Sequence, residues 1–294
     1  MEKLKGCYTA LITPFRNGKI DEDAFRKLID FQIKEGIDGL LVAGSTGEAS
    51  SLSQNEYFNL IKICTETVRE RVPVICGSGT NSTEKSVDMI RELSQFKING
   101  ILVIVPYYNK PTQQGMIEHF SRICENTDIP IIVYNIPGRT GINMLPSTLK
   151  KIREKCPGVI GVKEASGNLD QVSEIVRIMD ENFSVMSGDD SLTLPMMSVG
   201  AKGSISVVSN ILPGQTSCMC KLFAEGKHKE ALEIHKELFP LIKALFIETN
   251  PIPVKYATHL MGFCEPSLRL PLTELSNEHR SALKKAMINT GIAL

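Results

Sequence analysis

Short apolar runs alternate with amphipathic stretches along most of this chain. In the stretches between the runs, apolar residues recur at helical spacing, as Phe25, Leu28, Ile29 and Ile33 do. The runs end in Gly, Pro, Asn or hydroxyl residues, which is typical of strands that are buried on both sides. We therefore predict about eight strand–helix units, with strands near 7–12, 39–43, 72–76, 100–105, 130–135, 158–163, 183–187 and 203–208.

Several helix starts are marked by capping residues. Asp21 precedes the first helical pattern, and the third helix is expected to follow Ser82. Ser53 is followed three residues later by Glu56, which is the spacing of a capping box. These signals predict that helices follow the first three strands.

Eight parallel strand–helix units close most simply as a (β/α)8 TIM barrel. After about residue 222 no strand pattern recurs, and helical patterns run through 231–242, 254–260 and 279–287. We therefore predict a catalytic barrel over 1–224 and a C-terminal helical region over 225–294. A doubly wound open sheet is the alternative, but Gly77-Ser-Gly79 followed by Ser82 is not a complete dinucleotide-binding fingerprint.

Charge and composition exclude several classes of partner. The 33 basic and 33 acidic residues balance, which disfavours nucleic acid and anionic membranes as partners. No apolar run approaches the roughly 20 residues of a membrane span, and the first residues lack the apolar core of a signal peptide. We therefore expect a cytoplasmic protein.

Metal and cofactor chemistry is also disfavoured. The eight cysteines are spread along the chain and fit small core residues in a reducing compartment. Cys218 and Cys220 are too close together for a zinc-ligand pair, and the five histidines form no HExxH pattern. We expect no metal site and no cofactor.

The candidate chemistry centres on Lys163, at the end of the sixth apolar run. A lysine there is costly to bury, so it either reaches solvent, pairs with Glu164, or is desolvated for a purpose. Desolvation lowers the pKa of an amine, and a neutral amine is a nucleophile. Because barrel active sites lie at the carboxyl ends of the strands, the fold would gather Thr13, Ser45, Thr46, Tyr107, Tyr108, Tyr134, Arg139, Lys163, Gly188 and Ile205.

This set suits Schiff-base chemistry on a carbonyl substrate that carries a carboxylate. Lys163 would attack a ketone and lose water to give an iminium, and Tyr134 would move protons. Ser45 and Thr46, in a glycine-flanked loop before a helix, would hold a carboxylate. Arg139 would grip a second carboxylate. Each residue also has an ordinary interpretation: Tyr134 as a core tyrosine, Arg139 as a surface ion-pair member, and the loop glycines as a sharp turn.

The chain resembles the dihydrodipicolinate synthase family over essentially its whole length. The resemblance is carried by Gly44-Ser-Thr-Gly-Glu48, Pro106-Tyr-Tyr-Asn-Lys-Pro-Thr112, Tyr134-Asn-Ile-Pro-Gly-Arg-Thr-Gly141, Gly161-Val-Lys-Glu-Ala-Ser166, Ser187-Gly-Asp-Asp190 and Glu248-Thr-Asn-Pro-Ile-Pro-Val-Lys255. It implies Schiff-base condensation of pyruvate with L-aspartate 4-semialdehyde to 4-hydroxy-tetrahydrodipicolinate, in diaminopimelate and lysine biosynthesis. It also implies a homotetramer built as a dimer of dimers.

The same resemblance implies a role for each matching residue. Lys163 is the expected Schiff-base lysine and Tyr134 the acid–base phenol. Ser45 and Tyr108 are expected to complete a proton relay, with Tyr108 supplied by a neighbouring subunit. The remaining expected contacts are Thr46, Gly188 and Ile205 around pyruvate and Arg139 on the carboxylate of the semialdehyde.

Two departures from the family pattern affect these expectations. The family often has threonine where Ser45 stands, and serine there also occurs in the related N-acetylneuraminate lyases; the hydroxyl is kept, but the methyl that restricts χ1 is lost. Members inhibited by lysine place histidines and a carboxylate where Gln54, Tyr57 and Lys85 align here. Because an ammonium at Lys85 would repel the amine of lysine, we predict weak or absent lysine inhibition.

Two other functions remain as alternatives. The first is another pyruvate-dependent lyase or aldolase, such as an N-acetylneuraminate lyase, which would keep Lys163 and Tyr134 and differ in the pocket of the second substrate. Arg139 favours a short carboxylated aldehyde over a polyol. The second is a non-catalytic barrel that binds small carboxylates, which would be marked by loss of the lysine or the phenol; both are present.

Overall fold

The computed structural model describes residues 4–293 and confirms the predicted parallel barrel. Its eight strands close in the order β1-β10-β9-β8-β7-β6-β5-β4. All eight predicted runs match a strand within two residues at each end; the run predicted over 72–76, for example, forms Val74–Ser78. The barrel strands are β1 (Gly6–Ala10), β4 (Gly39–Val42), β5 (Val74–Ser78), β6 (Gly100–Ile104), β7 (Ile131–Asn135), β8 (Val159–Glu164), β9 (Ser184–Ser187) and β10 (Gly203–Ser206).

The helices follow the strands as the amphipathic stretches predicted. Asp21 caps the first helix through Ala24 N, and Ser53 with Glu56 forms the expected capping box. Ser82 precedes its helix without a side-chain capping bond. The helices after β1 to β9 are α1 (Glu22–Lys34), α2 (Gln54–Val68), α3 (Thr83–Leu93), α4 (Gln113–Cys124), α5 (Pro137–Thr140), α6 (Pro146–Lys155), α7 (Leu169–Ile178) and α8 (Thr193–Ser198).

Four helices follow β10: α9 (Pro213–Ala224), α10 (His228–Ala244), α11 (Ile252–Leu260) and α12 (Asn277–Asn289). Short 3-10 turns lie at η1 (Ala49–Ser51), η2 (Asp190–Leu192) and η3 (Val208–Asn210). The proposed boundary near residue 224 falls at the end of α9. A separate C-terminal domain over 225–294 stays a prediction.

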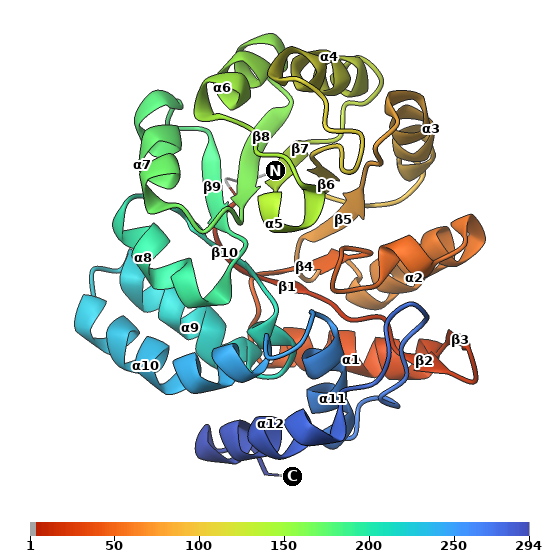
Figure 1. The fold of residues 1–294 in the computed structure, drawn as a ribbon, viewed down its shortest axis with the longest axis vertical. Helices are drawn as coiled ribbons and strands as arrows, with labels where there is room; N and C mark the ends of the chain where they lie inside the picture. The colour runs from red at the N-terminus through yellow and green to blue at the C-terminus, as the bar shows by residue number, and fades with distance from the viewer. Residues whose placement is uncertain (1–3, 294) are drawn as a thin grey trace. The chain divides into compact units, whose positions relative to one another are not determined.

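The chain divides into two compact units that are each described separately. The first contains the chain up to Gly6 and Ile75–Ile205, and the second contains Cys7–Val74 and Ser206–Leu294. In the first unit, α3, α4, α6 and α7 pack in sequence on the outer side of their strands (Figure 1). In the second, α1 packs on α2, and α10 packs on α9 and α12.

A small hairpin between β1 and α1 was not predicted. Its strands are β2 (Phe15–Arg16) and β3 (Lys19–Ile20), paired antiparallel. Asn17 and Gly18 both have positive φ, as a type I′ turn requires. The Asn-Gly pair is the signal that could have identified the hairpin.

The interior of the barrel strands is apolar, with a few polar exceptions. Val103, Ile132, Val133, Val162 and Met186 are fully buried, as expected for strands covered by helices on their outer face. Lys163 and Glu164 are buried at the carboxyl end of β8. Within residues 4–293, no helix is long and apolar enough to cross a membrane.

Candidate active site

Lys163 lies next to Tyr134 at the carboxyl ends of two neighbouring strands. Tyr134 on β7 pairs in register with Lys163 on β8, and Lys163 pairs with Met186 on β9. The Lys163 Nζ atom is 4.5 Å from the centroid of the Tyr134 ring. The phenol therefore stands where it can exchange protons with groups bound to the amine.

Burial changes the acid–base behaviour of Lys163. The side chain is 5% exposed, and its pKa is lowered from 10.5 to about 8, mainly by desolvation. The negative charge of Asp190 opposes this decrease in pKa, and the positive charge of Arg139 adds to it. A substantial fraction of the amine is thus neutral near physiological pH, as nucleophilic attack on a carbonyl requires.

Glu164 does not serve as the partner of Lys163. Successive residues of a strand point to opposite faces, and the Glu164 carboxylate instead accepts hydrogen bonds from Asn135 Nδ2 at 3.0 and 3.2 Å and from Gln171 Nε2 at 3.2 Å. The backbone N–H of Ser166 donates to Glu164 Oε1 at 2.8 Å. The ordinary interpretation, that Lys163 reaches solvent or pairs with Glu164, is therefore wrong.

This buried network extends to the segment that follows the short helix carrying Arg139. Asn135 donates to Asn143 Oδ1 at 2.8 Å, and its own Oδ1 accepts from Met144 N at 3.0 Å. The bonds between Asn135 and Glu164 join the ends of β7 and β8, one residue beyond Tyr134 and Lys163. Glu164 and Asn135 were not predicted as supporting residues, although an acid directly after the candidate lysine was the available signal.

Gly188 provides the space that Lys163 occupies. A Cβ atom at Gly188 would lie 2.8 Å from Ala165 Cβ and 3.1 Å from Lys163 Cε. The Gly188 N–H also donates to Glu164 O at 2.8 Å. A larger residue at position 188 would displace the Lys163 side chain, which explains why glycine stands at this predicted site position.

The other predicted residues of this unit differ in exposure. Ile205, on β10, is 1% exposed, whereas Arg139, in the short helix α5, is exposed. Tyr108 is 88% exposed and has a φ of 74°, a left-handed conformation that is uncommon for a bulky residue. Most of its side chain is thus uncovered by the chain that carries it.

Ser45 and Thr46 belong to the second unit, in the loop after β4. Thr46 is buried and its Oγ1 accepts a hydrogen bond from Asn250 Nδ2 at 3.0 Å. Thr13 Oγ1 donates to Gly47 O at 2.6 Å, which closes the loop. The structure thus brings Lys163, Tyr134 and Gly188 together, while the approach of Ser45 and Thr46 to them stays a prediction.

A buried ion pair supports the same loop. Lys255 Nζ lies 2.7 Å from Glu48 Oε1, and the two side chains are 0% and 1% exposed. Lys255 also donates to Thr13 O and to Ser267 O, and Arg269 N donates to Glu48 Oε2. Burial lowers the pKa of Lys255, with the Glu48 carboxylate opposing that decrease. The sequence motifs contained both residues, but nothing local indicated that they would meet.

The described residues hold no obvious metal centre. No group of three His, Cys, Asp or Glu side chains in residues 4–293 is placed to hold a metal ion.

Comparisons with known proteins agree on one family. A sequence model of the Dihydrodipicolinate synthetase family matches residues 3–290. A 4-hydroxy-tetrahydrodipicolinate synthase from Syntrophus aciditrophicus is 46% identical over 288 residues, covering 98% of this chain and 99% of the relative.

Solved structures give the same result. Dihydrodipicolinate synthase from Thermotoga maritima superposes with a TM-score of 0.97 at 42% identity, covering 99% of each chain. A chloride-inhibited dihydrodipicolinate synthase from Acinetobacter baumannii, complexed with pyruvate, has a TM-score of 0.96 at 35% identity, covering 98% of this chain and 99% of that one.

Proposed function

This chain belongs to the dihydrodipicolinate synthetase family, and on that premise we propose that it condenses pyruvate with L-aspartate 4-semialdehyde to give 4-hydroxy-tetrahydrodipicolinate. The reaction would serve the diaminopimelate route to lysine, in the cytoplasm. The observation that carries the proposal is the buried Lys163, with its lowered pKa, beside the Tyr134 phenol.

The first half of the reaction is assigned to Lys163. Its neutral amine attacks the ketone carbon of pyruvate, and loss of water leaves an iminium. Tyr134 supplies the proton that the leaving hydroxide needs and later removes one from the pyruvate methyl group, which gives an enamine. Thr46, Gly188 and Ile205 line the pyruvate subsite in this proposal.

The second half needs the semialdehyde to be held near the enamine. The enamine carbon attacks the aldehyde carbon, and the amine of the semialdehyde then displaces Lys163 as the ring closes. Arg139 is exposed, so its guanidinium can be reached by the carboxylate of the incoming aldehyde. This carboxylate grip favours the synthase over a lyase that acts on a sugar acid.

The main test is turnover of the purified protein with pyruvate and L-aspartate 4-semialdehyde, beside pyruvate and N-acetylmannosamine. We expect turnover with the semialdehyde only. Borohydride should trap pyruvate on the wild-type chain and on Lys151→Ala, an exposed control in α6, but not on Lys163→Ala. Turnover with the sugar alone would reassign the second substrate, and absence of any adduct would contradict the Schiff-base mechanism.

We also infer a homotetramer in which Tyr108 completes the relay of a neighbouring subunit together with Ser45. The support is the 88% exposure of Tyr108 and its left-handed backbone, a strained conformation that is more typical of functional sites than of free loops. Tyr108→Phe and Lys163→Ala should each be nearly inactive alone. Co-expressed, they should form mixed oligomers with restored turnover, because one subunit keeps the lysine and the other the phenol. Activity no higher than that of the parents would refute the shared site.

Lysine inhibition is expected to be weak or absent. Lys85 is exposed on α3, and Gln54 begins α2. An ammonium near the amine of an incoming lysine is repulsive. Steady-state turnover should therefore be unchanged by millimolar lysine, and Lys85→Glu is the variant expected to gain sensitivity. Strong inhibition of the wild-type protein at low lysine would show that the inference is wrong.

A further inference from the structure

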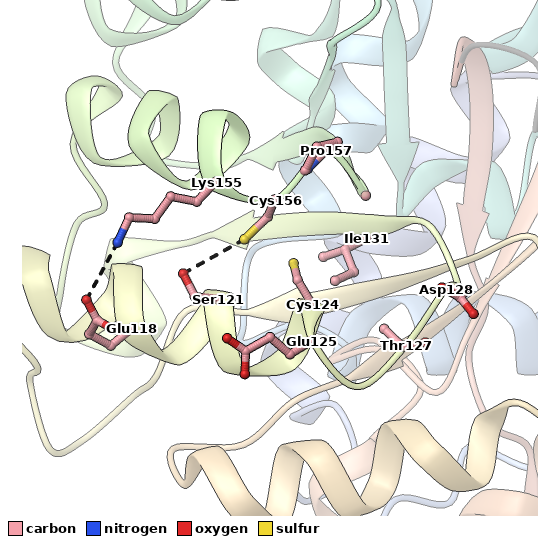
Figure 2. A pocket seen from close by; sticks show the side chains of 11 residues that line it. Glu118, Ser121, Cys124, Glu125, Thr127, Asp128, Ile131, Lys155, Cys156 and Pro157 are labelled. Atoms are coloured by element: carbon pink, nitrogen blue, oxygen red, sulfur yellow. Dashed lines mark hydrogen bonds and ion pairs between the residues drawn. The ribbon is translucent and has the colours of Figure 1, made fainter.

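A cavity lies at the end of the first unit opposite to Lys163. It has a volume of about 530 Å³ and opens between the last turns of α4 and α6, near the start of β7 (Figure 2). Cys124, Cys156 and Ser121 are among its lining residues. Lys163 lies four residues along β8 from Val159, or about 13 Å at 3.3 Å per residue. The cavity is therefore separate from the proposed active site.

Two thiols from distant parts of the sequence meet in this cavity. Cys124 is the last residue of α4, and Cys156 follows the last residue of α6. Both sulfur atoms are directed to the same part of the cavity wall, as Figure 2 shows. Cys156 is 3% exposed and Cys124 is half-buried. Solvent and small solutes can thus reach the pair, but large molecules cannot reach Cys156.

The surroundings favour the thiolate of Cys156. Hydrogen bonding from Cys124, the largest contribution, lowers the pKa of Cys156 to about 7, and the Ser121 hydroxyl and the Lys155 ammonium act in the same direction. The Cys156 Sγ is 3.9 Å from Ser121 Oγ, and Lys155 is 3.8 Å from Glu118. Burial and Glu125 oppose the decrease. The pKa of Cys124 is raised, so the two thiols differ in role.

We propose that Cys124 and Cys156 form a dithiol that hydrogen peroxide or a small hydroperoxide oxidises to an intrachain disulfide. The Cys156 thiolate attacks one peroxide oxygen, the O–O bond breaks, and Cys156 becomes a sulfenic acid while hydroxide leaves. The Cys124 sulfur then attacks the Cys156 sulfur and the S–O bond breaks. The proton of Cys124 goes to the departing hydroxide. Two thiols are oxidised by two electrons, and hydrogen peroxide is reduced to two waters.

The burial of Cys156 favours a small oxidant, and the position of Cys124 beside it favours a disulfide product. A nearly buried nucleophile favours a small peroxide over a bulky disulfide as the oxidant. A resolving thiol beside the sulfenic acid favours a disulfide over further oxidation. Thiols elsewhere in the described chain should react differently with peroxide. Cys64 is buried, and desolvation raises its pKa to about 12, whereas Cys218 is exposed on α9.

The test is a peptide map of the reduced full-length protein after brief treatment with hydrogen peroxide and alkylation. Trypsin separates the two cysteines into residues 123–139 and 156–163. We expect these peptides to appear joined, about 2 Da lighter than their sum, and to separate after reduction. The Cys124→Ser variant should instead hold Cys156 as a sulfenic acid that dimedone labels.

Cys218→Ser is the matched control, because Cys218 is the exposed thiol, and it should leave the joined peptide unchanged. Phenylarsine oxide, which bridges two neighbouring thiols, should block the peroxide reaction in the wild-type chain. The proposal is overturned if peroxide modifies Cys218 before the pair. It is equally overturned if Cys156 is oxidised to sulfinic acid while Cys124 remains a reduced thiol that can be alkylated.

Discussion

The lowered pKa of Lys163 makes a quantitative prediction about the pH dependence of adduct formation. Burial shifts this pKa from 10.5 to about 8, which corresponds to about 3 kcal/mol at 1.36 kcal/mol per pH unit. At pH 7.5 an amine with the lowered pKa is neutral in about one molecule in four, against about one in a thousand for an ordinary lysine. The lowered pKa therefore increases the reactive fraction by about 200-fold.

The sign of the dependence follows from the reactive form. The neutral amine attacks pyruvate, so the rate of adduct formation should rise with pH and level off above a midpoint near 8. The measurement is the single-turnover rate of borohydride-trapped pyruvate adduct between pH 6 and 10. A rate that keeps rising toward pH 10.5 would show that Lys163 is not desolvated as the structure describes.

Two variants test the causes of this pKa. The charge of Asp190 raises the pKa of Lys163, and that of Arg139 lowers it. Asp190→Asn should move the midpoint to lower pH, and Arg139→Gln should move it to higher pH. Lys151→Gln, an exposed change in α6, is the control and should leave it in place. Shifts in the opposite directions would refute the electrostatic reasoning.

Three further outcomes are expected. Glu164→Gln places an amide donor against Asn135 and Gln171 and should lower the free energy of unfolding by about 1–3 kcal/mol, measured in urea; a loss no larger than that of exposed Glu154→Gln would contradict this. Lys255→Met and Glu48→Gln should each cost about 3–5 kcal/mol, since each leaves a buried charge unpaired, and the double variant should cost less than the sum; additive losses would refute the coupling. Arg139→Ala should spare the pyruvate adduct and raise KM for the semialdehyde; loss of the adduct with unchanged KM would reverse its assignment.

The two lysines at the centre of these predictions illustrate different uses of burial. Burial lowers the pKa of both lysines, but the Glu164 carboxylate beside Lys163 is bonded to Asn135 and Gln171 instead of to the amine. Lys255 is paired with Glu48 and donates to two carbonyl oxygens, which occupies all three of its N–H groups. Burial by itself therefore does not identify a nucleophile; the partners of the ammonium do.

The sequence by itself determined the succession of strands and helices. Apolar runs bounded by turn residues, the Asp21 cap and the Ser53–Glu56 capping box are local signals, and the structure confirms them. Lys163 and Tyr134 were also predictable as neighbours, because consecutive parallel strands in a barrel place their carboxyl ends together.

Only the tertiary structure decided the environment of these residues. Whether Lys163 is desolvated depends on how β7 and β9 flank β8, and the partners of Glu164 come from β7 and α7. The pairing of Lys255 with Glu48, and of Cys124 with Cys156, joins residues far apart in the chain. Such contacts leave no periodic trace, because burial and pKa depend on every element packed around a group rather than on its sequence neighbours.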